Sequence, residues 1–200
     1  MEEDFWLEAA EWAEAKGADI ITSSLIYKEY DGPYEKNSYN YNDYNGKTAI
    51  TSLAATRSAH LGIVVCQAMG NYNQTSIPSL GSAADADSII SVGAITFSGD
   101  PASFTSNGPT SDGRTKPDVV APGVYVYTAV VKEISGDDST YEYSNGTSFS
   151  TPITAGICAL ILSAHPELTP LQVRDAVRNT ASLSGNPNNI LGWGIVNAYD

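Results

Sequence analysis

Helical and strand-like hydrophobic patterns alternate along the chain. Near the N-terminus, apolar residues recur at helical spacing, at Phe5, Ala9, Trp12 and Ala13. Gly17 follows as a typical helix stop. A short buried strand is then predicted at residues 19–25, a continuous apolar run of strand length occurs at 61–68, and further short β-rich runs occur at 88–95 and 118–121. Such runs are typical of strands covered on both faces, so they predict an α/β fold with a parallel sheet between two layers of helices.

Three further segments have helical patterns. One begins near Ile50, with Thr48 in the position of its cap. The second, residues 148–164, is apolar nearly all round, as expected for a helix enclosed by its own domain. The third opens at Thr169 with a capping box. A loop rich in Tyr and Asn, residues 27–45, separates the first two predicted strands.

Composition narrows the class of protein. The chain has 200 residues, 10 Lys plus Arg, 23 Asp plus Glu and a formal net charge of -13. With 42% hydrophobic and 16% charged residues it is expected to be globular. The acidic balance argues against nucleic acid and against an anionic membrane surface. No apolar run approaches 18 residues, so no membrane span is expected, and the acidic residues after Met1 do not resemble a signal peptide.

Redox and metal chemistry have weak signals. Cys66 and Cys158 both lie in apolar runs and are predicted to be buried free thiols. In residues 40–46, side chains whose oxygen atoms could bind calcium lie two positions apart. The bidentate Glu that ends a calcium-binding loop is missing, however. We therefore favour a solvated surface loop there. A structural calcium ion stays possible without a specific motif to support it.

Candidate chemistry concentrates at residues 145–152, which open the apolar helix. In the first helical turn, the Ser148 side chain would lie beside unpaired backbone N–H groups and the positive end of the helix dipole. Such an environment stabilises a developing oxyanion. By spacing alone, Ser148 is more simply an N-cap residue.

A wider set of motifs changes that interpretation. The segment Gly146-Thr147-Ser148-Phe149-Ser150-Thr151-Pro152 resembles the nucleophile motif of the subtilisin-like serine peptidases, the subtilases. Three more blocks resemble the same family in order along the chain, at residues 62–71, 104–123 and 192–198. The chain is therefore identified as a member of this family, with a three-layer subtilisin-like fold.

The resemblance implies roles for individual residues. Ser148 would be the nucleophile, and its backbone N–H together with the Asn71 side-chain amide would form the oxyanion hole. An extended polypeptide substrate would pair with Ser23, Ser24 and Leu25 and pass Gly70, by strand addition. No cofactor is required. Taken alone, Asn71 would be a left-handed residue after Gly70.

The base and its orienting acid are missing from the sequence. In this family Asp and His precede Ser along the chain, in Asp-Ser/Thr-Gly and His-Gly-Thr-His motifs that do not occur here. Helix geometry places His165 about 25 Å from Ser148. Strand geometry places His60 about 26 Å from the oxyanion site. Neither histidine is expected to act as general base.

We therefore expect residues 1–200 to be the C-terminal part of a serine endopeptidase catalytic domain whose N-terminal strands are missing. Its expected partners are an extended polypeptide substrate and the missing N-terminal half, and the parent protein would be secreted or extracytoplasmic. The chain alone should be inactive, and the open edge of residues 19–25 should make it poorly soluble or molten.

Two other readings stay open. The chain would be a non-catalytic peptide-binding member if no Asp or His motif lies upstream, or a generic α/β ligand-binding domain. Ile26 stands where the family usually has Gly, which should narrow the substrate pocket. The nearby Glu29, Asp31 and Glu35 are read as solvated loop charges, with a preference for basic substrates as the alternative.

Overall fold

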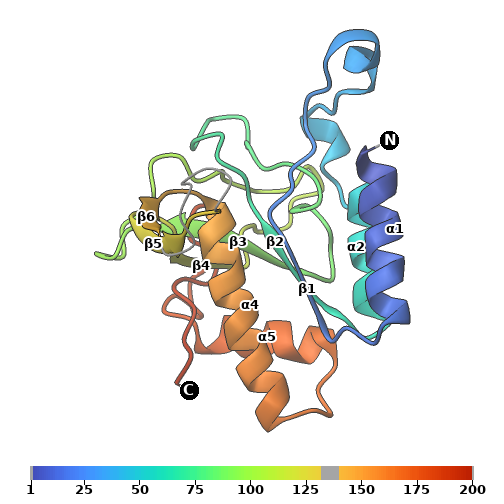
Figure 1. Cartoon of the computed structure of the whole chain (residues 1–200). Helices are drawn as coiled ribbons and strands as arrows, with labels where there is room; N and C mark the ends of the chain where they lie inside the picture. The colour runs from blue at the N-terminus through green and yellow to red at the C-terminus, as the bar shows by residue number, and fades with distance from the viewer. Residues whose placement is uncertain (1, 132–139, 200) are drawn as a thin grey trace.

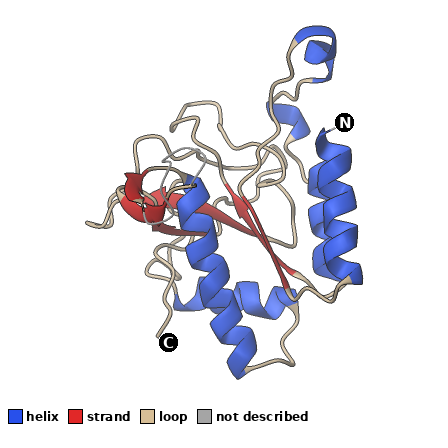
Figure 2. Ribbon diagram, viewed as in Figure 1, coloured by secondary structure: helices blue, strands red, loops and turns tan. Residues whose placement is uncertain are grey.

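The computed structural model describes residues 2–131 and 140–199. Within them, four parallel strands form the main sheet in the order β1-β2-β3-β4 (Figure 2). These strands are β1 (Ile20–Ser23), β2 (Val64–Ala68), β3 (Ile90–Ile95) and β4 (Val119–Pro122). A separate antiparallel pair is formed by β5 (Val126–Ala129) and β6 (Tyr141–Ser144). The predicted parallel sheet is confirmed.

Helices cover both faces of the main sheet (Figure 1). On one face lie α1 (Glu2–Ala15) and α2 (Ile50–His60), and on the other lie α4 (Thr147–Ala164) and α5 (Pro170–Thr180). Each face has its own apolar cluster, because alternate strand residues point to opposite sides. Val65 packs with Trp6 on the α1 side, whereas Val64 packs with Val173 on the α5 side. The three-layer arrangement is therefore confirmed.

Helix ends agree with the sequence in two cases and differ in one. Gly17 adopts a left-handed φ of 76° after α1, and Thr169 forms the expected capping box with Gln172. Thr48, however, does not cap α2, whose N-cap is Ala49 without a side-chain bond. The Glu3 carboxylate of α1 replaces a cap, because it accepts hydrogen bonds from Thr51 N and Thr51 Oγ1.

The environment of α4 differs from the expectation of an enclosed helix. Its inner face packs on the main sheet, but Leu160 is 63% exposed and Ile153 is also exposed. Its 18 residues also have the length and mean hydropathy, 1.4, of a membrane span, contrary to the expectation from composition. Because one side packs against all four strands of the main sheet, we interpret α4 as a core helix with an uncovered outer side.

The first strand is shorter and less buried than predicted. It covers residues 20–23, and its side chains are half-buried or exposed because β1 lies at the edge of the sheet. The loop at 27–45 that follows contains two short 3-10 helices, η1 (Gly32–Asn37) and η2 (Tyr41–Asp43). Its chain stands away from the sheet beside the start of α1 (Figure 1).

Both cysteines are buried free thiols, as predicted. Their sulfur atoms are 3.9 Å apart, Cys66 on β2 and Cys158 on α4. At this distance they are in contact without a disulfide bond. The pair therefore marks the junction between the sheet and the inner face of α4.

A buried ion cluster joins β4 to α5. The Asp118 carboxylate accepts hydrogen bonds from Ser91 N at 2.7 Å and from Lys116 Nζ at 2.8 Å, and it pairs with the Arg178 guanidinium. Burial would raise the pKa of Asp118, yet Lys116 and Arg178 together hold it well below its ordinary value. Arg178 also lies over the Trp193 ring, 4.0 Å from its centroid. This cluster fixes the end of the sheet opposite β1.

Candidate active site

Backbone geometry fixes Ser148 in the first turn of α4. Gly146 precedes the helix with a φ of 148°, a conformation that side chains rarely adopt. Its N–H donates to the Gly123 carbonyl, just after β4, at 2.8 Å. A Cβ at Gly123 would lie 2.4 Å from Ser150 Oγ, so only glycine allows this approach. The start of α4 is thereby held at the carboxyl end of the sheet, where parallel sheets place their sites.

Asn71 is held beside Ser148 by the residue that precedes the serine. Its Oδ1 accepts hydrogen bonds from Thr147 N at 2.9 Å and from Thr147 Oγ1 at 3.0 Å. Its Nδ2 donates no hydrogen bond within the described part of the chain and is therefore available to a ligand. The left-handed residue of this turn is Asn73, with a φ of 62°, not Asn71.

Pro152 exposes a second polar group at the same place. Proline has no N–H, so the Ser148 carbonyl lacks its usual helical donor four residues later. The Ser24 hydroxyl donates to that carbonyl at 3.3 Å. The structure thus brings Ser24 and Ser148 into contact across 124 residues of sequence.

The other predicted substrate residues lie around this contact with different roles. Ser23 Oγ accepts a hydrogen bond from Trp6 Nε1 at 3.0 Å, so it braces α1 against β1. Leu25 is exposed, and its carbonyl accepts a hydrogen bond from Gln67 Nε2 at 2.7 Å. Gly70 is buried with a φ of 104°, and a Cβ there would lie 3.0 Å from the Tyr72 ring. Leu25 and Ser24 are therefore open to a ligand, whereas Ser23 and Gly70 shape the backbone.

The model of the Subtilase family matches residues 3–194. The chain belongs to the subtilase family. Subtilisin E of Bacillus subtilis is 35% identical over 192 residues, which are 96% of this chain and 42% of that protein. Serine protease AprX of Bacillus subtilis is 41% identical over 153 residues, which are 68% of this chain and 34% of that protein.

Solved structures show the same fold. Fervidolysin from Fervidobacterium pennivorans, a keratinolytic enzyme related to subtilisin, superposes with a TM-score of 0.72 at 24% identity over 98% of this chain and 28% of that one. The self-cleaved protease domain of PatA gives 0.67 at 23% identity over 99% of this chain and 65% of that one. The chain thus spans less than half the length of the curated relatives named above.

Neither histidine of this subtilase chain lies at the candidate site. His60 Nε2 is 3.4 Å from Ser88 Oγ, and His165 Nδ1 is 3.5 Å from Glu167 at the far end of α4. Ser148 Oγ makes no hydrogen bond within residues 2–131 and 140–199. The described residues therefore place the Asn71 amide close to Ser148 without placing a base there.

Ile26 fills space next to the Ser24–Leu25 segment. A Cβ at Gly81 would lie 2.4 Å from Ile26 Cγ2, so the two residues are in close contact. The Ile26 side chain therefore packs against Gly81, and its effect on a substrate stays a prediction.

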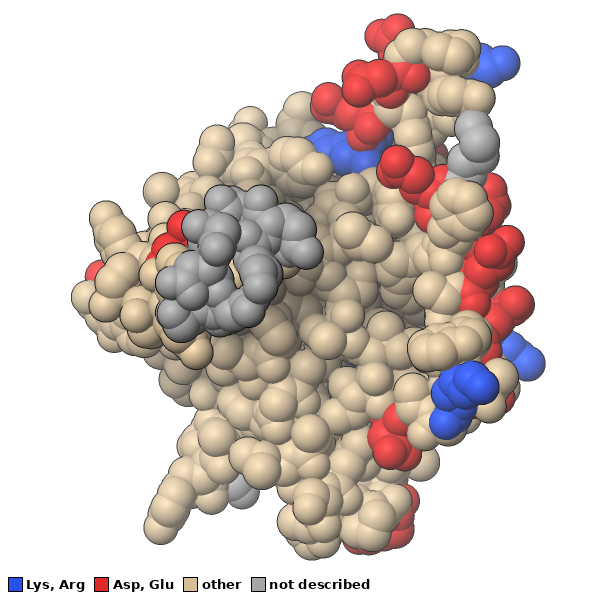
Figure 3. All heavy atoms as spheres, in the orientation of Figure 1, with Lys and Arg blue, Asp and Glu red and all other residues tan. Residues whose placement is uncertain are grey.

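Acidic side chains gather on the side of the molecule formed by α1 and the 27–45 loop (Figure 3). Glu29 and Asp31 line a cavity of about 600 Å³ there, together with Glu2 and Glu3. Glu35 is exposed and does not line it. Two of the three loop acids thus share a cavity.

Residues 40–46, where we favour a surface loop over a calcium site, contain η2. There the Asp43 carboxylate accepts from Asn40 N at 2.8 Å, and Asn40 Oδ1 accepts from Asn42 N at 3.0 Å. Their oxygens therefore cap η2. Within the described residues no group of three His, Cys, Asp or Glu side chains could hold a metal ion.

Sequence reasoning missed three residues that shape the site. Thr147 orients the Asn71 amide, Gly123 lets the start of α4 approach β4, and Pro152 frees the Ser148 carbonyl. Each lies in a segment that resembles the family, but their effects depend on contacts between segments far apart in sequence. Only Pro152, as a proline inside a predicted helix, carried a local signal.

Proposed function

We propose that this chain supplies the nucleophile and the oxyanion hole of a serine endopeptidase. Ser148 Oγ would attack the carbonyl carbon of an extended polypeptide. The oxyanion that forms would accept hydrogen bonds from the Ser148 N–H and Asn71 Nδ2. The observation that carries this proposal is the free Nδ2 of Asn71, fixed beside Ser148 through Thr147.

The proton of the Ser148 hydroxyl needs an acceptor that the described residues do not place there. We propose that a His and its orienting Asp come from residues outside this chain, carried by strands that add to the free edge of β1. Two surfaces support this completion: the half-exposed strand β1, and the outer side of α4 with Leu160. An extracytoplasmic location for the intact protein follows from the family resemblance and stays a prediction.

The test compares the intact protein with two variants. Ser148→Ala should abolish hydrolysis of a casein substrate, and Asn71→Ala should lower kcat by about 100- to 1000-fold with little change in KM. Thr75→Ala, in the exposed loop after Asn71, is a matched control that should keep full activity. Turnover that survives Ser148→Ala would contradict the proposed nucleophile.

Activity of the 200 residues alone provides a second test. Without a base, the chain should neither hydrolyse peptides nor react with a fluorophosphonate, which labels activated serines. Mixing it with the upstream segment of the same gene should restore both. Labelling of Ser148 in the chain alone would show that the base lies within it.

A second candidate function is peptide binding without cleavage. It is favoured by the absence of a base from the described surroundings of Ser148 and by the contact of Ile26 with Gly81. The intact protein would then bind extended peptides equally well with serine or alanine at position 148. It would release no cleavage products.

A further inference from the structure

Four exposed tyrosines share one face of the β5–β6 ribbon. Their side chains are 56% to 67% exposed, an unusual position for large aromatic groups. They are Tyr125, Tyr127, Tyr141 and Tyr143. Alternate residues of a strand point to the same side, so the opposite side of the ribbon carries Val126, Thr128 and Ser144, which are half-buried.

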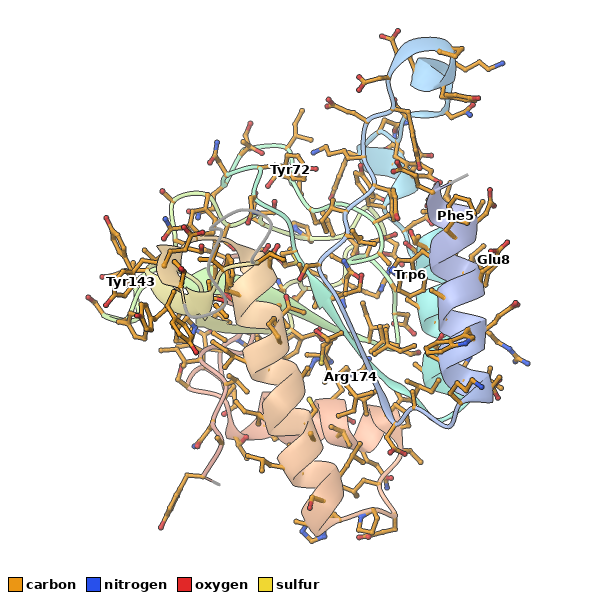
Figure 4. The ribbon with its side chains drawn as sticks, in the orientation of Figure 1. Phe5, Trp6, Glu8, Tyr72, Tyr143 and Arg174 are labelled. Carbon is orange, nitrogen blue, oxygen red and sulfur yellow. The ribbon has the colours of Figure 1, made fainter. Side chains whose placement is uncertain are left out.

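The four rings form a continuous row, which we call the tyrosine ladder. Tyr127 lies opposite Tyr143 in the strand register, with ring centroids 5.1 Å apart. Tyr127 also stacks on Tyr141 at 5.4 Å, and Tyr125 meets Tyr143 edge-on at 6.4 Å. Tyr143 projects on the side of the molecule opposite α1 (Figure 4). Neighbouring rings hold one another in place, so the ladder offers a pre-ordered aromatic surface.

The ladder is joined directly to the segment that carries Ser148. Tyr125 has a left-handed φ of 52°, a strained conformation for a residue with a side chain. Its N–H donates to Asn145 Oδ1 at 2.7 Å, three residues before Ser148. Strand β6 ends at Ser144 and runs through Gly146 into α4. The strained backbone of Tyr125 therefore places its ring in the ladder and also connects the ladder to the segment that carries Ser148.

The distance between the ladder and Ser148 is short enough for a single extended substrate chain to contact both. Ser148 is five positions after Tyr143, so their Cα atoms are at most about 17 Å apart at ~3.5 Å per residue. An extended peptide covers the same span with about five residues. A polypeptide that contacts Ser24 and Leu25 and continues past Ser148 would reach the ladder within a few residues.

We propose that the tyrosine ladder is a docking surface for the substrate polypeptide, and that it selects segments with aromatic or proline side chains. This inference rests on the proposed peptidase function. Tyrosine rings present a large, rigid, amphipathic area that binds peptides at a low cost in side-chain entropy. Aromatic surfaces also dock extended proline-rich segments. None of the four side chains is charged, and Glu142 lies on the opposite side of the ribbon, so recognition rests on ring contacts.

Binding to the intact protein carrying Ser148→Ala tests the proposal without cleavage. The probes are ten-residue peptides with one common central sequence and either Tyr-Pro or Ser-Ser at the fourth and fifth positions on one side of the centre. Fluorescence polarisation should give a Kd about tenfold lower for the Tyr-Pro peptide, and for one side only, since two ring contacts each contribute a few-fold.

Variants of the ladder then identify the surface. Tyr127→Thr with Tyr143→Thr keeps β-forming residues and should remove the tenfold difference. Tyr127→Phe with Tyr143→Phe should retain it. A control with Phe97→Thr and Tyr199→Thr removes two other exposed aromatic residues and should change nothing. If the double threonine variant does not fold by circular dichroism, Tyr143→Thr alone should reduce the difference about threefold.

Several outcomes would overturn the proposal. Equal Kd values for the two peptides would do so, as would a tyrosine preference that survives the threonine variant. Self-association lost in that variant would show a contact between copies of the chain, and retention on insoluble polysaccharide lost there would show a carbohydrate surface. If ladder-dependent binding is found but the protein with Ser148 hydrolyses no peptide, the proposed function fails while the ladder remains a peptide-docking surface.

Discussion

The two edges of the main sheet are finished in different ways. At β4 the chain itself covers the edge, because Val120 N donates to the Gly194 carbonyl and Val196 N donates to the Val120 carbonyl, each at 3.0 Å. At β1 no strand lies beyond the edge among the described residues, and the side chains there are half-buried or exposed. One edge is closed by a segment near the C-terminus, and the other presents free backbone groups that could pair with another strand.

The inner and outer sides of helix α4 show the same contrast between covered and exposed surfaces. Cys158 and Ala155 pack into the core on the inner side, whereas Leu160 is open on the outer side. A helix with apolar residues on both sides is typically buried on both sides, but α4 is not. The comparison shows that the hydrophobic pattern of a segment does not by itself tell which of its sides the described residues cover.

The largest effect is expected from opening the closed edge. Asp118→Ala would leave the buried Lys116 ammonium and the Arg178 guanidinium without their shared carboxylate. We expect the free energy of unfolding of the intact protein to fall by about 3–5 kcal/mol, measured by urea denaturation. Asp112→Ala, which breaks the surface pair with Arg114, is the control and should cost less than about 1 kcal/mol. Equal losses would refute a special role for the buried cluster.

The second prediction concerns the exposed outer side of α4. Leu160→Lys adds a charge to the uncovered side of α4, so the 200-residue chain alone should become more soluble without losing helix content. The same change should reduce complementation by the upstream segment at least tenfold, since the ammonium would then be buried. Leu61→Lys, at the exposed end of α2, is the matched control. Complementation unaffected by Leu160→Lys would place the covering segment elsewhere.

The same contrast explains what the sequence could and could not predict. The strands at 64–68 and 90–95 were predictable because their apolar runs are buried on both faces. The burial of β1 and α4 was overestimated, because an apolar pattern does not show which faces the neighbouring segments cover. Thr48 was wrongly expected to cap α2, since the actual partner, Glu3, lies 48 residues from Thr51.

The candidate site was likewise predictable only in part from the sequence. Ser148 and Asn71 were found from local motifs, and the structure brings both to one end of the sheet. The contacts that orient them, from Thr147 to Asn71 and from Ser24 to the Ser148 carbonyl, cross 76 and 124 residues of sequence. Long-range hydrogen bonds of this kind leave no periodic signal in the sequence. Their roles therefore had to wait for the structure.

A smaller effect is expected from acid at the closed edge. The pKa of Asp118 is lower in the folded protein than the unfolded value of about 3.9, so its stabilising contribution is complete above that value. The contribution is lost as the pH falls below about 4, because the unfolded chain then binds the proton more tightly. Asp118→Asn should flatten the pH dependence of the urea midpoint below that pH. A wild-type midpoint that does not fall with acid would contradict this assignment.

The smallest effect concerns how firmly α4 stays on the sheet when its outer side is open. The contact with Cys158, together with burial, raises the pKa of the Cys66 thiol, so little reactive thiolate is present at pH 8. Reaction with a thiol reagent therefore requires α4 to lift from β2. In the 200-residue chain alone the outer side of α4 is exposed. Labelling of Cys66 should therefore be a few times faster than in the intact protein. Cys158→Ala leaves Cys66 as a single reporter and should preserve that ratio, whereas equal rates would mean that cover on the outer side does not hold the inner side in place.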